Sequence, residues 1–256
     1  MIFYFSSTGN CKYVSERIAE KTGESIQPIR DYYEYEEIKY TLKKGENLGF
    51  VLPTYYGGFP NIVIEFLEHL TVQYSEDNYV FFVATYGSGT ANIGVEAQKR
   101  IGALGKPLDA SFGVKMVDNW NPSFDMTDKA YIEKAEQTAE AQLPHVIDQI
   151  ASKACALELK KTVPSLLQHV IVRMYAKACN TGKFSVSPVC VGCGLCERQC
   201  PSHAIKVENE KPVWIKDQCT LCLGCVHRCP VNAIAYTDAT NTHGQYFNPH
   251  VKPDVL

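Results

Sequence analysis

Residues 190–205 read CVGCGLCERQCPSHAI, and residues 219–234 repeat the same pattern as CTLCLGCVHRCPVNAI. Both copies have the spacing C-x2-C-x2-C-x3-C-P, at an offset of 29 residues. An internal repeat of this kind predicts a small pseudo-twofold module in which each half completes the other. Because eight of the eleven cysteines of the chain lie in these two copies, the module is predicted to be built around its thiols.

The cysteine spacing predicts two [4Fe–4S] clusters with crossed ligands. Three cysteines in steps of three present their thiolates to one cubane, while the fourth, followed by proline, faces the other. By this rule one cluster takes Cys190, Cys193, Cys196 and Cys229, and the other takes Cys219, Cys222, Cys225 and Cys200. A pair of zinc sites is the alternative, but such sites usually come from two separated C-x2-C pairs and not from triplets followed by Cys-Pro.

The remaining residues of the repeat, and the cysteines outside it, have simpler predicted roles. Gly192, Gly194 and Gly224 are expected to permit the tight loops around the sulfurs. His203 and His227 are interpreted as surface or hydrogen-bonding residues, since eight thiolates already suffice for two clusters. Two further cysteines, Cys155 and Cys179, have no partners by spacing and are expected to be small buried hydrophobes.

Composition narrows the class of protein. The chain has 256 residues, 45% of them hydrophobic and 21% charged, with a formal net charge of −3. These are ordinary globular values, and the charge balance gives no reason to expect nucleic acid or an anionic membrane as a partner. The N-terminal MIFYFSSTGN lacks the features of a secretory signal, and runs such as Tyr79–Thr85 are too short for a membrane span. We therefore expect a cytoplasmic protein, in which many cysteines indicate metal or redox chemistry.

The first part of the chain alternates continuous apolar runs with helical patterns. This alternation predicts an α/β fold with a doubly wound, parallel, five-stranded sheet. The predicted strands are residues 1–6, 47–53, 79–85 and 111–117, with a weaker one near 25–29. The predicted helices are residues 10–21, 61–72 and 90–104.

From residue 127 to about 180 the pattern is helical, with Pro164 marking a helix start. One apolar stripe consists of Val163, Leu166, Leu167, Val170, Ile171, Met174 and Ala178. Its basic flanks leave a membrane-surface helix as an alternative, but we expect the stripe to pack on the neighbouring domain. The predicted organisation is a domain over residues 1–150, a helical connector over 151–183, a small α+β cluster domain over 184–240 and a tail over 241–256.

Three loops follow predicted strands, at the edge of a parallel sheet where ligands bind. Ser6–Cys11 lies between a strand and a helix, so amide groups and the helix dipole converge there on an anion, although an ordinary helix cap is an alternative. Pro53–Pro60 (PTYYGGFP) and Ala84–Thr90 (ATYGSGT) follow the next two central strands. Their aromatic side chains favour a flat, ring-shaped ligand.

These loops resemble those of the flavodoxin family over about residues 1–150: IFYFSSTGN resembles its phosphate loop, and the two Tyr/Gly loops resemble those that sandwich the isoalloxazine. With the cysteine module, the whole chain is similar to a family of prokaryotic ferredoxins that have an N-terminal flavodoxin-like domain. The resemblance implies that FMN is bound, with its phosphate held by Ser6, Thr8, Gly9, Asn10 and Cys11. It implies that the ring is framed by Thr54, Tyr55, Gly57, Tyr86, Gly87, Gly89, Asn119 and Trp120. Cys11 departs from the threonine that is usual in flavodoxins, and a thiol is a weaker donor than a hydroxyl.

These residues predict an electron-transfer protein that passes electrons between FMN and two [4Fe–4S] clusters, with redox proteins as partners. One alternative is an enzyme, an FMN-dependent reductase of a small substrate with Tyr56, Phe59, Trp120 and Phe124 lining the pocket. Another is a ferredoxin whose flavodoxin-like domain is empty and serves for docking. We favour the carrier because no triad, paired carboxylate or hydrolase motif is evident.

Overall fold

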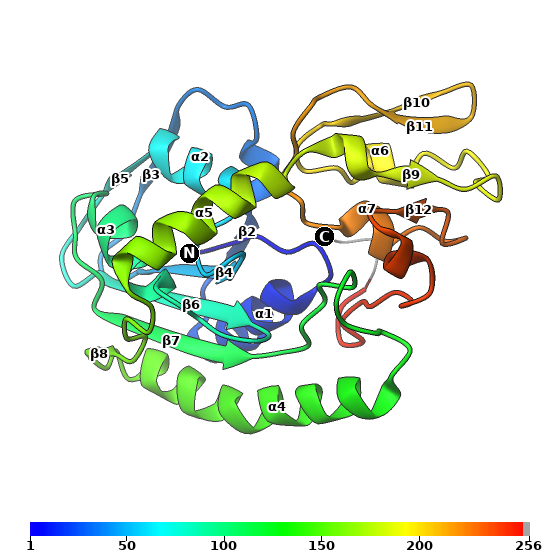
Figure 1. Ribbon diagram of the computed structural model, residues 1–256. Coiled ribbons are helices and arrows are strands. Elements are labelled where there is room, and N and C mark those ends of the chain that lie inside the picture. The colour runs from blue at the N-terminus through cyan, green and yellow to red at the C-terminus, as the bar shows by residue number, and fades with distance from the viewer. Residues whose placement is uncertain (253–256) are drawn as a thin grey trace.

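The computed structural model describes residues 1–252. At its centre is a parallel sheet with the strand order β2-β1-β4-β6-β7-β8, which confirms the doubly wound α/β architecture (Figure 1). The strands are β1 (Ile2–Tyr4), β2 (Ile26–Pro28), β4 (Asn47–Pro53), β6 (Tyr79–Tyr86), β7 (Ala110–Lys115) and β8 (Ala156–Leu157). Five strands were expected, and the two-residue β8 adds a sixth at the edge of the sheet.

Two hydrophobic cores cover the two faces of this sheet. Successive residues of β1 alternate between them, with Ile2 on one face and Phe3 on the other, as the period of two in a strand requires. The face of Phe3 is covered by α2 (Asn61–His69) and α3 (Ile93–Gly102). The face of Ile2 is covered by α1 (Asn10–Thr22) and α4 (Lys129–Ala151). Burial on both faces explains why the central strands are continuous apolar runs.

Two predicted helical stretches are partly wrong. The helix that starts at Asn61 ends at His69, and Leu70–Gln73 form β5, which pairs in parallel with β3 (Ile38–Thr41). A 3₁₀ turn, Ile29–Tyr32, precedes that pair. The helical pattern predicted from residue 127 to 180 is also interrupted, because β8 lies between α4 and α5 (Ser165–Ala178).

The orientation of α5 differs from expectation. Gln168 and Tyr175 face the rest of the molecule: Gln168 Nε2 donates to the Gly57 carbonyl (3.2 Å), and the Tyr175 hydroxyl donates to the Thr220 carbonyl (2.8 Å). These two polar anchors fix the helix, so the apolar stripe predicted to pack on the neighbouring domain points largely to solvent. Leu166 is 80% exposed and Met174 is 56% exposed.

The cysteine module lies beside the carboxyl ends of the sheet strands (Figure 1). It consists of two short antiparallel pairs and two single-turn helices, with 3₁₀ turns at Thr181–Lys183 and Asp238–Asn241. Its regular elements are β9 (Ser185–Val186) paired with β12 (Ile234–Ala235), β10 (Ile205–Glu208) paired with β11 (Lys211–Trp214), α6 (Leu195–Arg198) and α7 (Gly224–His227). Within residues 1–252, none of the helices combines the length and the apolar character needed to cross a bilayer.

Candidate functional site

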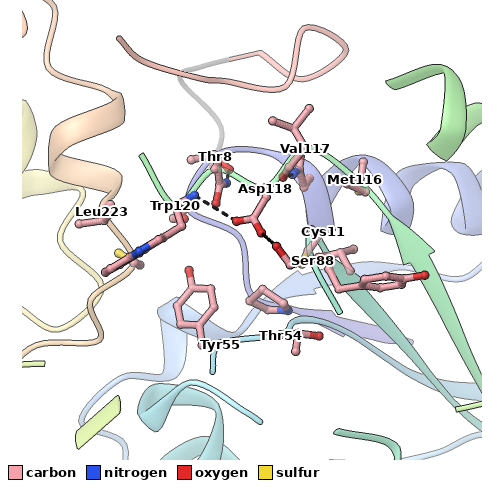
Figure 2. A pocket seen from close by; sticks show the side chains of 18 of the residues that line it. Thr8, Cys11, Thr54, Tyr55, Ser88, Met116, Val117, Asp118, Trp120 and Leu223 are labelled. Carbon is pink, nitrogen blue, oxygen red and sulfur yellow. Dashed lines mark hydrogen bonds between the residues drawn. The ribbon is translucent and has the colours of Figure 1, made fainter. Parts of the chain in front are cut away.

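A cavity of about 370 Å³ opens at the carboxyl ends of β1, β4, β6 and β7. Figure 2 shows that side chains from the loops after these strands point into it. The cysteine module contributes the rest of the wall through Leu221, Cys222 and Leu223, together with Tyr175 of α5. This volume is in the range of sites for small molecules and cofactors, and it lies where open parallel sheets bind ligands.

The loop between β1 and α1 forms one end of the cavity. Gly9 has φ +98°, and its amide donates to Ser6 Oγ (3.1 Å), so the chain turns sharply into α1. The first helical backbone bond is from the Tyr13 amide to the Gly9 carbonyl, which leaves the amides of the preceding turn without helical partners. These amides and the positive end of the helix dipole are suited to a phosphate.

The C-terminal segment packs over this loop, a contact that the sequence did not predict. The Asn248 amide donates to the Thr8 carbonyl (2.8 Å), and Asn10 Oδ1 accepts from both Asn248 Nδ2 and the Tyr246 hydroxyl (3.1 Å each). Ser6, Thr8, Asn10 and Cys11 line the cavity, but Gly9 does not, because it faces Asn248. An added Cβ at Gly9 would lie 2.8 Å from the Asn248 Cβ. Of the predicted tail, residues 253–256 lie outside the described chain.

Cys11 links the phosphate loop to the central sheet. Its Sγ lies 3.1 Å from Thr85 Oγ1 at the end of β6. Burial raises the pKa of this thiol to about 12, so it stays protonated at neutral pH. Cys11 therefore contributes a neutral contact between two loops and carries no charge toward an anion.

The predicted ring-framing residues surround the other end of the cavity. All of them line it: Thr54, Tyr55, Gly57, Tyr86, Gly87, Gly89, Asn119 and Trp120. Among the described residues, no partner meets the buried Thr54 Oγ1, so this hydroxyl is an unsatisfied polar group in the pocket wall. The expectation that Phe59 lines the pocket is wrong. Phe59 is buried in the core, where its ring is edge-on to Phe82 with 5.5 Å between the centroids.

Asp118 holds two of these loops together, a role that the family resemblance, which implies only that the loop Met116–Trp120 borders the flavin, did not give it. Its Oδ2 accepts from Ser88 Oγ (2.5 Å), and its Oδ1 accepts from the Trp120 amide (3.3 Å). Gly87 makes this approach possible, because an added Cβ there would lie only 2.2 Å from the Asp118 Cβ. On the same loop, Asn119 Nδ2 donates to Thr8 Oγ1, so the phosphate and ring ends of the site are connected.

The aromatic rings of the pocket come from both parts of the chain. Trp120 is edge-on to Tyr56 (6.0 Å between centroids) and to Tyr236 of the cysteine module (5.8 Å). Phe124 also lines the cavity, as expected. Such edge-to-face pairs fix the orientation of each ring.

The eight repeat cysteines are divided between two smaller cavities. Cys190, Cys193, Cys196 and Cys229 line one, and Cys200, Cys219, Cys222 and Cys225 line the other. The division matches the crossed ligand sets expected from the spacing. Backbone amides point at three of the sulfurs: Ala204 at Cys200 (3.3 Å), Ala233 at Cys229 (3.2 Å) and Leu221 at Cys219 (3.2 Å). Such donors stabilise thiolates and tune the potential of a bound cluster.

The two copies of the repeat share an unusual backbone. Gly192 and Gly194 have φ +66° and +72°, and the equivalent Leu221 and Leu223 both have φ +53°. A left-handed conformation costs a residue with a side chain about 1–2 kcal/mol. Both leucines are buried and pack with the pocket aromatics, so their side chains separate the second cysteine cavity from the larger pocket. Gly224, expected to supply a tight turn, is instead the first residue of α7.

Hydrogen bonds join the cysteine module to the first domain. His227 Nε2 donates to the Asn119 carbonyl (2.8 Å), and Nδ1 accepts from the Tyr246 amide (3.1 Å). Burial lowers the pKa of His227 to about 4, so the ring is neutral and has one defined tautomer. On the surface, Glu34 Oε1 lies 3.2 Å from Lys216 Nζ, and Glu34 Oε2 lies 3.4 Å from His203 Nδ1.

The two cysteines outside the repeat behave differently from one another. Cys179 is buried, as expected, and its carbonyl accepts from the Cys219 amide (3.0 Å). Cys155 is exposed, so the expectation of a buried side chain is wrong there. It follows α4 in the surface connection to β8, a connection that the sequence pattern assigned to a helix.

Comparison with known proteins divides the chain in the same way. Residues 1–142 match the model of the flavodoxin domain family, and residues 189–234 match that of the 4Fe-4S dicluster domain. The cysteine region is 38% identical over 52 residues to the ferredoxin-like protein in the nif region of Sinorhizobium fredii, covering 18% of this chain and 81% of that protein.

Two further similarities are more limited. Over 45 residues the chain is 42% identical to a component of the ion-translocating oxidoreductase complex of Methanosarcina acetivorans, covering 18% of this chain and 17% of that component. It therefore spans about a sixth of that protein's length. A solved flavodoxin of Streptococcus pneumoniae TIGR4 aligns at 16% identity over 57% of this chain and 97% of its own, with a TM-score of 0.32.

Proposed function

Because the chain belongs to the flavodoxin domain family and carries a 4Fe-4S dicluster domain, we propose that it transfers electrons between FMN and two [4Fe–4S] clusters. When bound, FMN accepts one or two electrons and each cluster exchanges one. The observation that carries the proposal is the shared wall: Cys222, a thiol of the second cysteine cavity, also lines the large pocket between the flavodoxin-type loops.

The donor sets support both kinds of cofactor. Each cysteine cavity is lined by four thiols, and amide-to-sulfur hydrogen bonds occur in both, at Cys229 in one and at Cys200 and Cys219 in the other. In the large pocket, the amides at the start of α1 suit a phosphate, and Thr54, whose buried hydroxyl has no partner among the described residues, lines the pocket together with the aromatic rings. We therefore assign the phosphate end to Ser6, Thr8, Asn10 and Cys11, and the ring end to the predicted ring-framing residues.

The arrangement gives the two cysteine cavities different places in the proposed path. We assign the cavity of Cys200, Cys219, Cys222 and Cys225 as the inner site, next to the flavin. The cavity of Cys190, Cys193, Cys196 and Cys229 is the outer site, where Cys193 is exposed and Val191 is 64% exposed. Leu221 and Leu223 exclude water from the boundary between the inner site and the flavin. Redox proteins would then dock at the outer site, and a cytoplasmic location suits such partners.

Iron, sulfide, zinc and flavin measured on one anaerobically purified sample test this proposal. We expect about eight irons and one FMN per chain. Zinc in place of iron would refute the cluster assignment, and eight irons without flavin would leave a ferredoxin with an empty docking domain. Reduction of a small acceptor that needs no partner protein, and that is lost with Trp120→Ala, would instead support a reductase.

The assignment of inner and outer sites has a separate test. Cys200→Ser and Cys229→Ser should each reduce the iron content from about eight to about four while affecting different clusters. Flavin reduction by an external donor should be slower in both variants, because the proposed path passes through both sites. After direct photoreduction, the flavin should pass electrons quickly to the remaining cluster in Cys229→Ser, where that cluster is the inner one, and slowly in Cys200→Ser. Equally fast transfer in both variants would contradict the assignment.

A further inference from the structure

The outer surface of α5 is apolar, although nothing in the structure covers it. Five of its residues are large, hydrophobic and roughly half exposed or more: Leu166 (80%), Leu167 (50%), Val170 (49%), Val172 (47%) and Met174 (56%). The spacing of Leu166, Leu167, Val170 and Met174 puts four of them on one stripe of the helix. Monomeric proteins rarely expose such a continuous apolar surface without a partner.

The charge around this stripe has one sign. Between Leu159 and Cys196 the sequence contains five Lys and Arg residues and no Asp or Glu, although the whole chain has a net charge of −3. The five are Lys160, Lys161, Arg173, Lys177 and Lys183. Among residues 1–252, none of these five side chains takes part in an ion pair with a carboxylate. No carboxylate in the described part of the chain therefore neutralises these charges, although Lys160 Nζ donates to the Leu157 carbonyl, Lys161 Nζ donates to Ser165 Oγ, and Lys183 Nζ lies over the Tyr236 ring.

We propose that α5 docks the protein on an anionic phospholipid bilayer, lying in the plane of the interface with its apolar stripe inserted. Arg173 and Lys177 lie on α5 itself, so their stems can extend along the apolar surface while their charges reach lipid phosphates. Lys160 and Lys161 precede the helix, and Lys183 follows it, which places positive charge at both of its ends. A second copy of this chain is a poorer occupant, because it would bring like charges together.

The face of α5 opposite the apolar stripe contacts the large pocket, so docking of the helix would take place next to that pocket. That face holds Tyr175, which lines the pocket, and Gln168, which bonds the Gly57 carbonyl. Figure 1 shows α5 crossing the front of the first domain, from lower left to upper right toward the cysteine module, with no other element drawn over it in this view. The docking proposal does not depend on which cofactors are bound, since it rests only on α5 and the residues beside it.

Sedimentation with vesicles tests the proposal on the full chain, purified anaerobically. We expect the protein to pellet with vesicles that contain phosphatidylglycerol and phosphatidylcholine, and not with phosphatidylcholine alone. Arg173→Gln combined with Lys177→Gln should weaken binding roughly 25-fold, about fivefold for each charge removed. Leu166→Ser combined with Val170→Ser should weaken it at least about tenfold. Val95→Ser with Lys99→Gln, on the exposed face of α3, is the matched control and should bind normally.

Three results would overturn the proposal. One is failure to pellet with anionic vesicles at a salt concentration of about 0.1 M, where surface charges are only partly screened. Another is equal loss of binding in the α3 control. The third is a dimer by light scattering that Leu166→Ser with Val170→Ser dissociates, since the occupant of the stripe would then be a second copy. Unchanged circular dichroism and iron content establish that each variant is folded.

Discussion

Gly87→Ala is the most informative single substitution in the large pocket. The added Cβ would lie 2.2 Å from the Asp118 Cβ and 2.5 Å from its Cα, where ordinary contact begins at 3.4 Å. The loop that carries Asp118, Asn119 and Trp120 must therefore move outward by about 1.2 Å. Overpacking of this kind costs about 1–3 kcal/mol of stability. If this cost falls on the FMN-bound form, it corresponds to roughly 5- to 100-fold weaker FMN binding, at about 1.4 kcal/mol for each factor of ten.

Gly102→Ala is the control for this substitution. Gly102 ends α3 outside the pocket, and an added Cβ there meets only the Pro107 Cα, at 3.9 Å. Titration of the flavin-free protein with FMN, followed by fluorescence under anaerobic conditions, measures both variants, and thermal unfolding measures the loss of stability. If Gly87→Ala binds FMN as tightly as Gly102→Ala, then contact with Asp118 does not shape the flavin site and the reasoning fails.

Four further predictions concern Cys11, the backbone of the cysteine repeat and the packing of the C-terminal segment. Cys11, buried and with a pKa of about 12, should resist iodoacetamide at pH 8 in the native protein while the exposed Cys155 reacts; equal labelling would mean that the phosphate loop is open. Leu223→Gly relieves a left-handed backbone but removes a buried side chain, so it should destabilise the protein by about 1–4 kcal/mol in anaerobic denaturation. Stabilisation by Leu223→Gly would contradict the claim that this side chain separates the second cysteine cavity from the large pocket. Gly194→Ala, at φ +72°, should lower the free energy of unfolding by about 1–2 kcal/mol. Tyr246→Phe combined with Asn248→Ala removes both donors to Asn10 Oδ1, so it should lower stability by about 1–3 kcal/mol and weaken FMN binding, whereas unchanged FMN affinity would show that the C-terminal segment does not support the loop.

Much of the architecture was predictable because its causes are local in the sequence. The runs 47–53 and 79–85 are apolar at nearly every position, which is typical only of strands covered on both faces. The cysteine sets follow from the spacing of the repeat, and the flavodoxin-type loops follow strands of a parallel sheet. Topology alone then brings those loops to one edge.

The predictions are wrong where contacts between residues distant in the sequence determine the local structure. Leu70–Gln73 contains Leu and Val at positions compatible with a helix face or a strand, and pairing with β3 selects the strand. The direction of the α5 stripe depends on Gln168 and Tyr175, whose partners Gly57 and Thr220 are distant in sequence. Nothing in the residues around Tyr246 or Asn248 indicates that they reach the phosphate loop.

The leucines of the second repeat illustrate the same limit. From sequence, the change from Gly192 and Gly194 to Leu221 and Leu223 reads as ordinary divergence between copies. The role of the two leucines follows only from the structure, in which the second copy of the cysteine repeat packs against the first domain. The side chains then fill the boundary with the large pocket, and the backbone strain of the left-handed conformation has a function.

The shared wall also has a consequence for how the protein matures in the cell. Leu221, Cys222 and Leu223 complete the large pocket, and their loop takes its shape around the thiols of the inner cavity. On the proposed cofactor assignment, we expect a newly made chain without iron to have an incomplete wall on one side of its flavin pocket, however well its first domain folds. Cofactor insertion should be ordered, with cluster assembly before stable flavin retention, so iron-starved cells should accumulate protein deficient in both.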